Sequence, residues 1–535
     1  MHVEDLIDQM GAFGRYQMLV TSLALGPVIA TAWSLLSMSF SSVVPDWWCV
    51  TLGSGVANLT RDSPLYKYCP DEASKANGTA IACTRVYAQG VRTVVTEWDL
   101  VCEKSWVTST VTSIQMAGVL TGALLAGQSA DLWGRRTINF GFTALMIVAN
   151  LVAALSVAWQ MYAVTMFFIG LSCGVVLVVG IQMAVECTGA KWRTVHAAIP
   201  FWQTGVAVFA LFSYLLEDWQ HLHFASAAIY SPLVLGWIIL PESVRWLATQ
   251  NRLEDAEKAV ETIARYNRCP KPTNALAKLR MVAEEAKHEA TGAARKYTYL
   301  DVYRSWKMFR RSLCSNVIWF SSALVFYVIS LGVQKLSFNL YLNIFLIGCA
   351  DIPCTFLSFY LTRTCFGRRW AAASFYFLTC ACCIGIVIAS VTATEENKGA
   401  VMNYLAIAAK LCLGGGWDVM TVFSTEIYPT VIRSLGYGAS SAFARIGGIV
   451  APFIALMTDN LVLPYSAMSV LMLLSGACAL LLPETRLVAM EDLIIVKTCT
   501  SDVSDVMLPC ADVSENSLPT LYNEKNKSDE VHVRL

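Results

Sequence analysis

Charged residues are scarce in this 535-residue chain, where Asp, Glu, Lys and Arg make up 15% and hydrophobic residues 56%. Soluble domains carry about 25% charged residues, so this composition excludes a soluble multidomain enzyme. Acidic and basic residues number 39 each, which leaves no basic excess to favour nucleic acid as a partner. Clusters of metal ligands, Walker-type phosphate loops and nucleophile elbows are also missing. We therefore expect no enzymatic activity, no cofactor, no metal site and no ATP-driven pumping.

The hydrophobic residues gather in long blocks of about 20 residues, the length that crosses a bilayer as a helix. Backbone polar groups find no water in the hydrocarbon, so such segments have to be helical. The first block starts at Met18 and is too long for a signal peptide, so we expect it to remain as an anchor. The sequence predicts an all-α polytopic membrane protein with twelve transmembrane helices, at 18–40, 107–127, 137–157, 161–185, 195–216, 223–240, 313–333, 338–361, 371–392, 401–423, 434–457 and 461–482.

The distribution of Lys and Arg predicts the orientation in the membrane. Arg135, Lys191, Arg368 and Arg433 fall in connections on one side, and the opposite connections hold few cations. Cytoplasmic connections are enriched in Lys and Arg, and an even number of spans then places both termini in the cytoplasm. The predicted parts are a cytoplasmic N-terminus (1–17), an N-terminal half (18–240) with a large extracellular loop (41–106), a cytoplasmic helical loop (241–312), a C-terminal half (313–482) and a disordered cytoplasmic tail (483–535).

The extracellular loop contains two glycosylation sequons and four cysteines. The sequons begin at Asn58 and Asn77, where we expect glycosylation, although sequons also occur by chance. Cysteines in an oxidising compartment form disulfides, so we expect two bonds with three possible pairings. The candidates are Cys49, Cys69, Cys83 and Cys102.

The C-terminal residues Val533-Arg534-Leu535 have an apolar-x-apolar pattern. A PDZ domain binds such an ending by adding it to its sheet as a strand. Three-residue endings of this kind also arise by chance, so a PDZ-domain partner is one of two interpretations of this terminus.

Three short motifs occur twice, in the same order. Gly134-Arg135-Arg136 matches Gly367-Arg368-Arg369, and Pro241-Glu242-Ser243 matches Pro483-Glu484-Thr485. Glu186 is followed after seven residues by Arg193, next to the fourth span. Glu426 is followed after seven residues by Arg433, next to the tenth span. This repetition indicates two six-helix halves with the substrate site between them. The charges could pair between helix ends and part when the halves rock, or only anchor the helix ends to headgroups. The candidate gating residues are Asp131, Arg135, Arg136, Glu186, Arg193, Arg368, Arg369, Glu426 and Arg433.

Four ionisable residues lie inside predicted spans of the second half: Asp351, Lys410, Asp418 and Arg445. A charge at the bilayer centre costs a few kcal/mol, so each needs a partner or a water-filled cavity. One interpretation is that Arg445 or Lys410 holds an anionic substrate group. The other is that the two cations pair with the two acids and hold helices together.

Aromatic residues in spans 5, 7 and 10 could line an amphipathic pocket, although such residues more often face lipid or pack between helices. Trp417 follows Lys410 by seven residues, so both point to one helix face. The other candidates are Trp202, Gln203, Trp319, Phe326 and Tyr327.

Several motifs resemble a known family. The segment 131–136, ending in Gly134-Arg135-Arg136, resembles the signature between the second and third helices of the major facilitator superfamily. The segments 10–17, 96–102, 241–246 and 426–433 resemble motifs of the organic cation, anion and carnitine transporter family. The resemblance runs from about residue 1 to 486. It implies the major facilitator fold, broad specificity, and exchange or facilitated movement.

The segment Ala444-Arg445-Ile-Gly447 is most similar to the organic anion branch, in which an arginine of span 11 faces the substrate cavity. Lys410 likewise resembles a lysine of anion-type members. The sequence departs from that branch after Asp351-Ile-Pro353-Cys354, where Thr355 stands near the place of an expected lysine. This departure favours monovalent or zwitterionic substrates over dicarboxylates.

We therefore expect a plasma-membrane transporter of small organic anions that works by alternating access. Arg445, helped by Lys410, would hold the acidic group, and aromatic residues would contact the apolar body of the substrate. The alternatives are a transporter of organic cations or carnitine-like zwitterions that uses Asp418 or Asp351, and a membrane receptor without transport. The predicted binding residues are Arg445, Lys410, Trp417, Tyr327, Phe326, Trp319, Trp202, Gln203 and Asp418.

Overall fold

The computed structural model describes residues 2–50, 66–69, 84–88, 90–189, 192, 199–291, 299–332, 339–363, 366–428, 432–456 and 462–485. Residues 1–494 form one compact unit, and all described residues belong to it. The predicted features at Asn58, Asn77, Cys83 and Arg193 and the C-terminal residues 533–535 lie outside the described residues.

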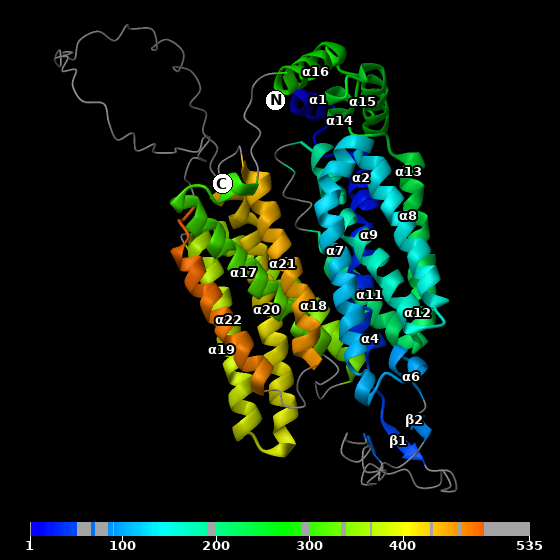
Figure 1. Ribbon diagram of the computed structural model, residues 1–535. Coiled ribbons are helices and arrows are strands. Elements are labelled where there is room, and N and C mark those ends of the chain that lie inside the picture. Colours follow the sequence, from blue (N-terminus) through cyan, green and yellow to red (C-terminus); the bar gives the residue numbers. More distant parts are fainter. Residues whose placement is uncertain are drawn as a thin grey trace, which may run out of the picture. The chain divides into compact units, whose positions relative to one another are not determined.

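Twelve apolar segments of the described chain correspond to the predicted spans (Figure 1). Eleven are long and apolar enough to cross a membrane, and the twelfth is the shorter apolar helix α11. The predicted all-α membrane fold is therefore confirmed. The first half contains α2 (Arg15–Leu25), α3 (Pro27–Leu36), α4 (Met38–Ser41), α7 (Trp106–Trp133), α8 (Arg135–Ala154), α9 (Trp159–Glu186), α11 (Phe201–Leu216), α12 (Trp219–Tyr230), the 3-10 helix η3 (Ser231–Leu235) and α13 (Gly236–Ile239). The second contains α17 (Trp306–Leu331), α18 (Leu340–Arg363), α19 (Gly367–Thr392), α20 (Glu395–Ile427), α21 (Arg433–Leu456) and α22 (Val462–Leu481).

The fifth predicted span, 195–216, differs from the observed helix at its start. Helix α11 begins at Phe201, directly after Pro200. Proline has no backbone N–H and disfavours the helical conformation of the residue before it, so a helix starts after it more readily than it passes through. Hydropathy does not report this conformational effect, because Ile199 and Pro200 do not interrupt the apolar segment by their polarity.

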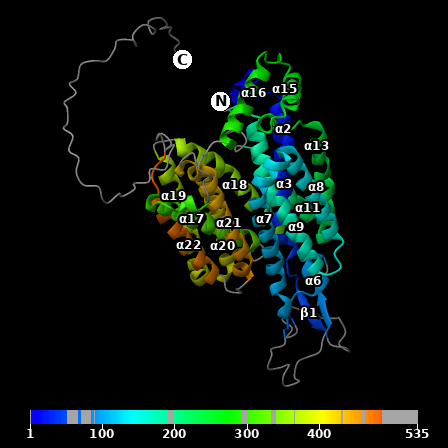
Figure 2. The same ribbon diagram turned by 45° about the horizontal axis from the view of Figure 1, so that its top comes forward.

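Four short helices gather at one end of the first half, which we call the cap end. They are α1 (His2–Gln9), α14 (Val244–Thr249), α15 (Leu253–Asn267) and α16 (Ala275–Thr291), and both views place α1 beside α16 (Figures 1 and 2). Leu6 and Ile7 are buried in one apolar cluster with Val260 and Ile263. Asn267 fixes this packing, because its side chain accepts from Tyr16 N at 2.8 Å and donates to Met10 O at 2.9 Å.

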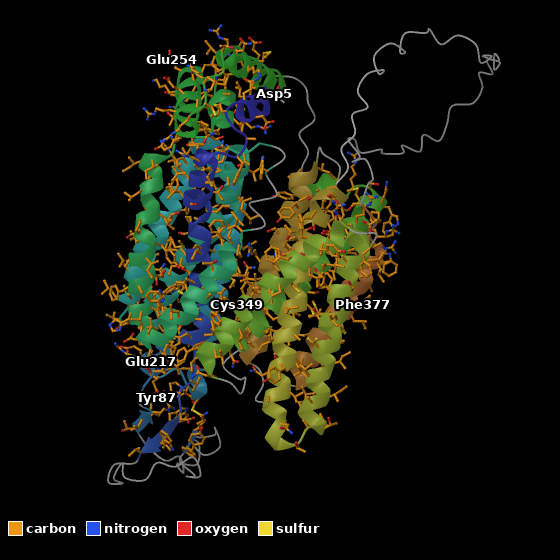
Figure 3. All side chains as sticks on the ribbon, turned by 180° about the vertical axis from the view of Figure 1, so that it is seen from behind. Asp5, Tyr87, Glu217, Glu254, Cys349 and Phe377 are labelled. Carbon is orange, nitrogen blue, oxygen red and sulfur yellow. A yellow bond between two sulfur atoms is a disulfide. The ribbon has the colours of Figure 1, made fainter. Side chains whose placement is uncertain are left out.

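The opposite end carries an antiparallel two-stranded sheet, and we call it the hairpin end. Strands β1 (Trp47–Val50) and β2 (Thr84–Tyr87) pair Trp47 with Tyr87. A disulfide joins Cys69 to Cys102, one of the pairings that the sequence left open, and Cys49 is disulfide-bonded too. Figure 3 places Tyr87 and Glu217 at this end and Asp5 and Glu254 at the cap end.

Helices α7 and α9 pack closely because both present glycines to each other. A Cβ atom at Gly118 or Gly122 would collide with the backbone of Phe167 or Leu171 in α9. Gly170 and Gly174 face α7 in the same way. Small residues let helix backbones approach within a membrane, where hydrophobicity alone does not drive helices together.

The two halves contact each other through α7 with α21 and α11 with α18. Ser109 Oγ donates to Pro452 O at 2.8 Å, and Ser113 Oγ donates to Ile449 O at 2.7 Å. Ser39 Oγ donates to Ser330 O at 3.0 Å in the same part of the molecule. These hydrogen bonds join the halves toward the hairpin end of the spanning helices.

Candidate functional site

A cavity of about 300 Å³ lies between the two halves. This volume is at the lower end of the range for small-molecule pockets. The first half contributes apolar side chains of α2, α3 and α9 and the start of α11. The second half contributes aromatic and charged side chains of α17, α18, α20 and α21. The lining residues are Leu25, Val28, Leu177, Ile181, Ile199, Phe201, Trp202, Gln203, Phe326, Tyr327, Asp351, Gly414, Trp417, Asp418 and Arg445.

Arg445 is the cation that the structure places on the wall of this cavity. Its Nε is buried and has no hydrogen-bond partner among the described residues. The guanidinium lies beside the Tyr327 side chain, and no described carboxylate lies within the 4 Å of an ion pair. A charged donor left unused in a low-dielectric site is costly unless a ligand satisfies it. The arrangement can therefore hold an anionic group.

Two carboxylates, Asp351 and Asp418, line the same cavity. Asp351 is 6% exposed, and its Oδ1 has no hydrogen-bond partner among the described residues. The hydroxyls of Thr355 and Ser358 lie close to Asp418. Asp351 and Lys410 attract each other electrostatically, although no described ion pair within 4 Å joins either acid to Lys410 or Arg445.

Gly414 lets Asp351 lie directly against α20, because a Cβ at this position would collide with Asp351 Oδ1. We expect Gly414→Ala to lower the unfolding temperature, since overpacking a fitted site costs about 1–3 kcal/mol. Thermal unfolding of purified protein checks this. Gly127→Ala is the matched control, because nothing lies within 4 Å of a Cβ there. Equal unfolding temperatures for the two variants would contradict the expectation.

Lys410 is not among the residues that line the cavity. Its side chain is 2% exposed, and Nζ donates to Ser330 Oγ at 2.8 Å. The same Nζ lies 2.8 Å from the ring centroid of Phe326, which does line the cavity. Lys410 thus lies behind Phe326, and the Phe326 ring stands between its ammonium group and the cavity.

Five of the six predicted lining residues of spans 5, 7 and 10, including Gln203, reach the cavity, and Trp319 lies behind it. The Trp202 and Phe326 rings are 6.3 Å apart and bridge the two halves. Trp417 stacks edge-on with Trp319 at 5.1 Å, and Trp319 Nε1 donates to Ser424 Oγ at 2.8 Å. The indole of Trp319 therefore supports Trp417.

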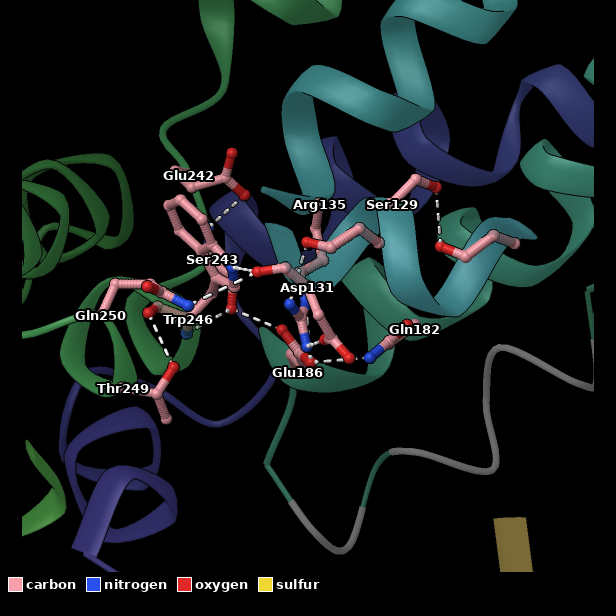
Figure 4. Close-up of polar contacts among 12 residues, drawn as sticks. Ser129, Asp131, Arg135, Gln182, Glu186, Glu242, Ser243, Trp246, Thr249 and Gln250 are labelled. Carbon is pink, nitrogen blue, oxygen red and sulfur yellow. Dashed lines mark hydrogen bonds and ion pairs between the residues drawn. The ribbon is translucent and has the colours of Figure 1, made fainter. Parts of the chain in front are cut away.

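Three of the predicted gating residues of the first half, Asp131, Arg135 and Glu186, form a polar network at the cap end (Figure 4). Arg135 Nε lies 3.3 Å from Glu186 Oε1, and Arg135 Nη2 lies 2.8 Å from Asp131 Oδ1. Ser243 Oγ donates to the other oxygen of Glu186. Glu242 Oε1 accepts from the backbone N of Arg136 at 2.9 Å. The network joins the ends of α7, α8 and α9 to the segment that follows α13.

The second half repeats this network with matching residues. Arg368 Nη2 lies 2.7 Å from Glu426 Oε1, and Thr485 Oγ1 donates to Glu426 Oε2 at 2.7 Å. Glu484 accepts from the backbone N atoms of Arg368 and Arg369, at 3.0 Å each. The glycines before the two arginine pairs both have positive φ, +95° at Gly134 and +71° at Gly367, which glycine adopts without strain.

The acids of the repeat thus pair within each half, Glu186 with Arg135 and Glu426 with Arg368. Arg193 and Arg433 follow these acids by seven residues and are the other predicted gating arginines of this motif. Arg193 and the side chain of Arg433 lie outside the described residues.

Sequence reasoning did not single out the apolar wall of the cavity, formed by Leu25, Val28, Leu177 and Ile181. Apolar residues in apolar spans carry no signal that separates a cavity wall from a lipid-facing surface. It also missed Gly414 as the neighbour of Asp351, because a glycine in an apolar span carries no sign of which side chain lies against it.

Comparison with known proteins identifies the family. Residues 50–494 match the family model "Sugar (and other) transporter". Solute carrier family 22 member 16 of Xenopus laevis is 30% identical over 534 residues, covering 90% of this chain and 92% of the relative. The organic cation transporter protein of Drosophila melanogaster is 28% identical over 513 residues, with 91% and 92% covered.

Among solved structures, the inward-open conformation of the xylose transporter XylE from E. coli superposes with a TM-score of 0.61 at 16% identity. The match covers 88% of this chain and 96% of XylE, and it confirms the twelve-helix major facilitator fold. The chain therefore belongs to the sugar (and other) transporter family of the major facilitator superfamily and, within it, to solute carrier family 22, whose members are membrane transporters and not enzymes.

Proposed function

We propose that this protein transports small organic anions across the plasma membrane by alternating access, with Arg445 holding the anionic group. The observation that carries this proposal is the buried Nε of Arg445, which lines the cavity between the halves and has no hydrogen-bond partner among the described residues. A guanidinium binds a carboxylate or sulfonate through two parallel hydrogen bonds. The cavity of about 300 Å³ suits a small ligand.

The remaining cavity wall supports a substrate with an apolar body. Trp202, Phe326 and Trp417 present rings from both halves, and Leu177 and Ile181 face them from α9. Rings and aliphatic side chains of this kind bind many flat or branched apolar groups without directional contacts. Such a wall supports broad specificity, with the charge of the substrate fixed by Arg445.

Alternating access is supported by the position of the contacts between the halves. Tyr341 of α18 donates through its hydroxyl to Glu217 Oε1 at 3.2 Å, and its ring lies 5.5 Å from that of Tyr214. Like Ser330, Ile449 and Pro452, Tyr341 lies between the cavity and the hairpin end. In this account these contacts close the hairpin side, and rocking of the halves breaks them.

We expect Tyr341→Phe to weaken this closure. A hydrogen bond to a carboxylate contributes about 1.5–3 kcal/mol, so its loss should raise amide exchange in α4 and at the start of α18 about tenfold or more. Hydrogen–deuterium exchange of the purified protein measures this. Tyr360→Phe on the same helix is the matched control, because that side chain is 67% exposed. Unchanged exchange in Tyr341→Phe would rule out Tyr341 as part of the closure.

The charge distribution supports the orientation, with the cap end in the cytoplasm. The basic connections that the positive-inside rule assigns to the cytoplasm begin or end at the cap end, and the disulfide Cys69–Cys102 lies at the hairpin end, where an oxidising environment would preserve it. In this orientation both termini are cytoplasmic.

A second candidate function is the transport of organic cations or zwitterions. It is favoured by Asp351, whose buried Oδ1 has no described hydrogen-bond partner and faces the same cavity. The fly relative is named an organic cation transporter. A zwitterion would place its cationic group near Asp351 or Asp418 and its anionic group at Arg445.

Parallel uptake assays in cells separate these candidates. Cells that express the chain receive a labelled organic monoanion, a monocation or carnitine, and cells with empty vector are the control. The proposal predicts uptake of the monoanion above the control. Uptake of the cation alone would replace it with the second candidate, and binding of any of the three without flux would indicate a receptor.

A further inference from the structure

A second cavity, of about 270 Å³, lies at the cap end and apart from the substrate cavity. The ends of α7 and α8 form one wall, with Trp133, Arg136 and Thr137. Helices α14 and α15 form the other, with Trp246, Arg252 and Lys258 among the lining residues. We propose that this cavity binds the phosphodiester headgroup of an anionic membrane lipid.

The charges around the cavity match a ligand with one negative charge. Arg136, Arg252 and Lys258 face two acids, Glu242 and Asp255, which leaves one net positive charge. Both acids are already engaged. Glu242 accepts from backbone N–H groups, and Asp255 Oδ2 accepts from Arg252 Nη2 at 2.6 Å, with Lys258 Nζ at 3.8 Å from Oδ1. A phosphodiester, which carries one negative charge, would therefore neutralise the site.

The guanidinium of Arg136 has unused donor capacity. Nη1 donates to Leu240 O at 3.0 Å, whereas Nε is buried and has no hydrogen-bond partner among the described residues. Phosphate oxygens are the acceptors that an arginine fork fits best. The residue that carries this unsatisfied donor lines the cavity, which is the second, independent sign of an anionic ligand.

The surroundings identify the source of the phosphate as a lipid. Leu132 and Trp133 are 70% and 63% exposed at the end of α7, and Ile238 of α13 is 84% exposed. Exposed apolar and aromatic side chains at the ends of spanning helices lie in the acyl chains and headgroup region of the bilayer. A ligand that enters over this surface would keep its acyl chains in the membrane.

Lipid binding would also support the neighbouring network. Trp246 lines this cavity and donates through Nε1 to Asp131 O at 2.8 Å, and Asp131 pairs with Arg135 (Figure 4). A bound headgroup would thus hold α14 against the ends of α7 and α8. We expect it to raise the unfolding temperature of the protein.

The test measures lipid retention by the purified full-length protein. Native mass spectrometry compares retained phosphatidylglycerol and phosphatidylcholine for the wild type, for Arg252→Gln/Lys258→Gln, and for Lys271→Gln/Arg280→Gln. The last variant removes one Lys and one Arg at the cap end but outside the cavity, because Lys271 lies in the connection between α15 and α16 and Arg280 lies in α16. Each cation near the membrane surface contributes about 1 kcal/mol to binding, so we expect the cavity variant to lose phosphatidylglycerol retention about tenfold or more. The control variant should retain it.

Thr262→Trp provides a second variant, because it fills the cavity without removing a charge. It should also lose phosphatidylglycerol, and its folding is checked by its unfolding temperature. Equal retention by the cavity and control variants would overturn the proposal. Displacement of phosphatidylglycerol by millimolar glycerol 3-phosphate would overturn the lipid assignment and identify a site for soluble phosphates instead.

Discussion

Replacing Arg445 with alanine should reduce uptake of an organic monoanion by about 30-fold or more. Truncating one member of a buried charge pair costs about 2–4 kcal/mol, and 1.4 kcal/mol corresponds to a factor of ten. Arg445 makes no described ion pair, so its removal leaves no described carboxylate without a partner and should not prevent folding. The measurement is uptake normalised to protein at the cell surface.

Two further variants make this result specific. Arg445→Lys keeps the charge but loses the planar fork, so uptake should recover in part. Arg310→Ala removes an exposed arginine near the start of α17 and should leave uptake unchanged. If Arg445→Ala reached the surface and retained more than half of wild-type uptake, Arg445 would be a structural residue and the acids would become the candidate binding groups.

Replacing Glu186 with alanine should lower the free energy of unfolding by about 2–4 kcal/mol. Its carboxylate accepts from Arg135 and Ser243, and the side chains of Glu186 and Arg135 are each 11% exposed. Removing one partner of a buried pair leaves an uncompensated charge, which costs about 3–5 kcal/mol. Asp131 still faces Arg135 at 2.8 Å and should reduce that cost. Thermal unfolding of the purified protein measures the change.

The repeat supplies a comparison for this prediction. Glu426→Ala should cost less, because the Arg368–Glu426 side chains are more exposed, at 22% and 18%. Glu254→Ala, at the solvent-facing start of α15, should have almost no effect (Figure 3). Equal unfolding temperatures for Glu186→Ala and Glu254→Ala would show that the network does not stabilise the cap end.

The fold could be predicted from the sequence because the bilayer imposes a strong constraint. A run of about 20 apolar residues satisfies its own backbone hydrogen bonds in hydrocarbon as a helix, so hydropathy alone located all twelve segments. The error at the start of α11 came from Pro200, whose effect is conformational and not hydropathic.

The candidate site was only partly predictable. Arg445 and Lys410 gave the same signal, a cation in an apolar span, yet Arg445 lines the cavity and Lys410 lies behind Phe326. Lys410 and Trp417 share a helix face but lie two turns apart. Phe326 of α17 can therefore separate Lys410 from the cavity while Trp417 lines it. How neighbouring helices pack decides such differences, and one sequence does not contain that information.

The repeated motifs predicted more of the structure at the cap end than the individual charges did. Pro241-Glu242-Ser243 and Pro483-Glu484-Thr485 indicated equivalent positions, and the structure places each acid against the positive-φ glycine of its own half. The charges at 186 and 426 were expected either to pair between helix ends or to anchor those ends to headgroups, and the sequence did not name the partner of each acid. The described partners, Arg135 and Arg368, are distant in the chain and come from a neighbouring helix.

A counterflow assay measures whether the cavity at Arg445 carries organic anions across the membrane. Proteoliposomes that contain only the purified chain are loaded with an unlabelled organic monoanion and diluted, without ATP, into the labelled compound. The proposed function predicts transient accumulation of label with the wild type and none with Arg445→Ala. Accumulation only when a cation replaces the anion on both sides, or undiminished accumulation with Arg445→Ala, would contradict it.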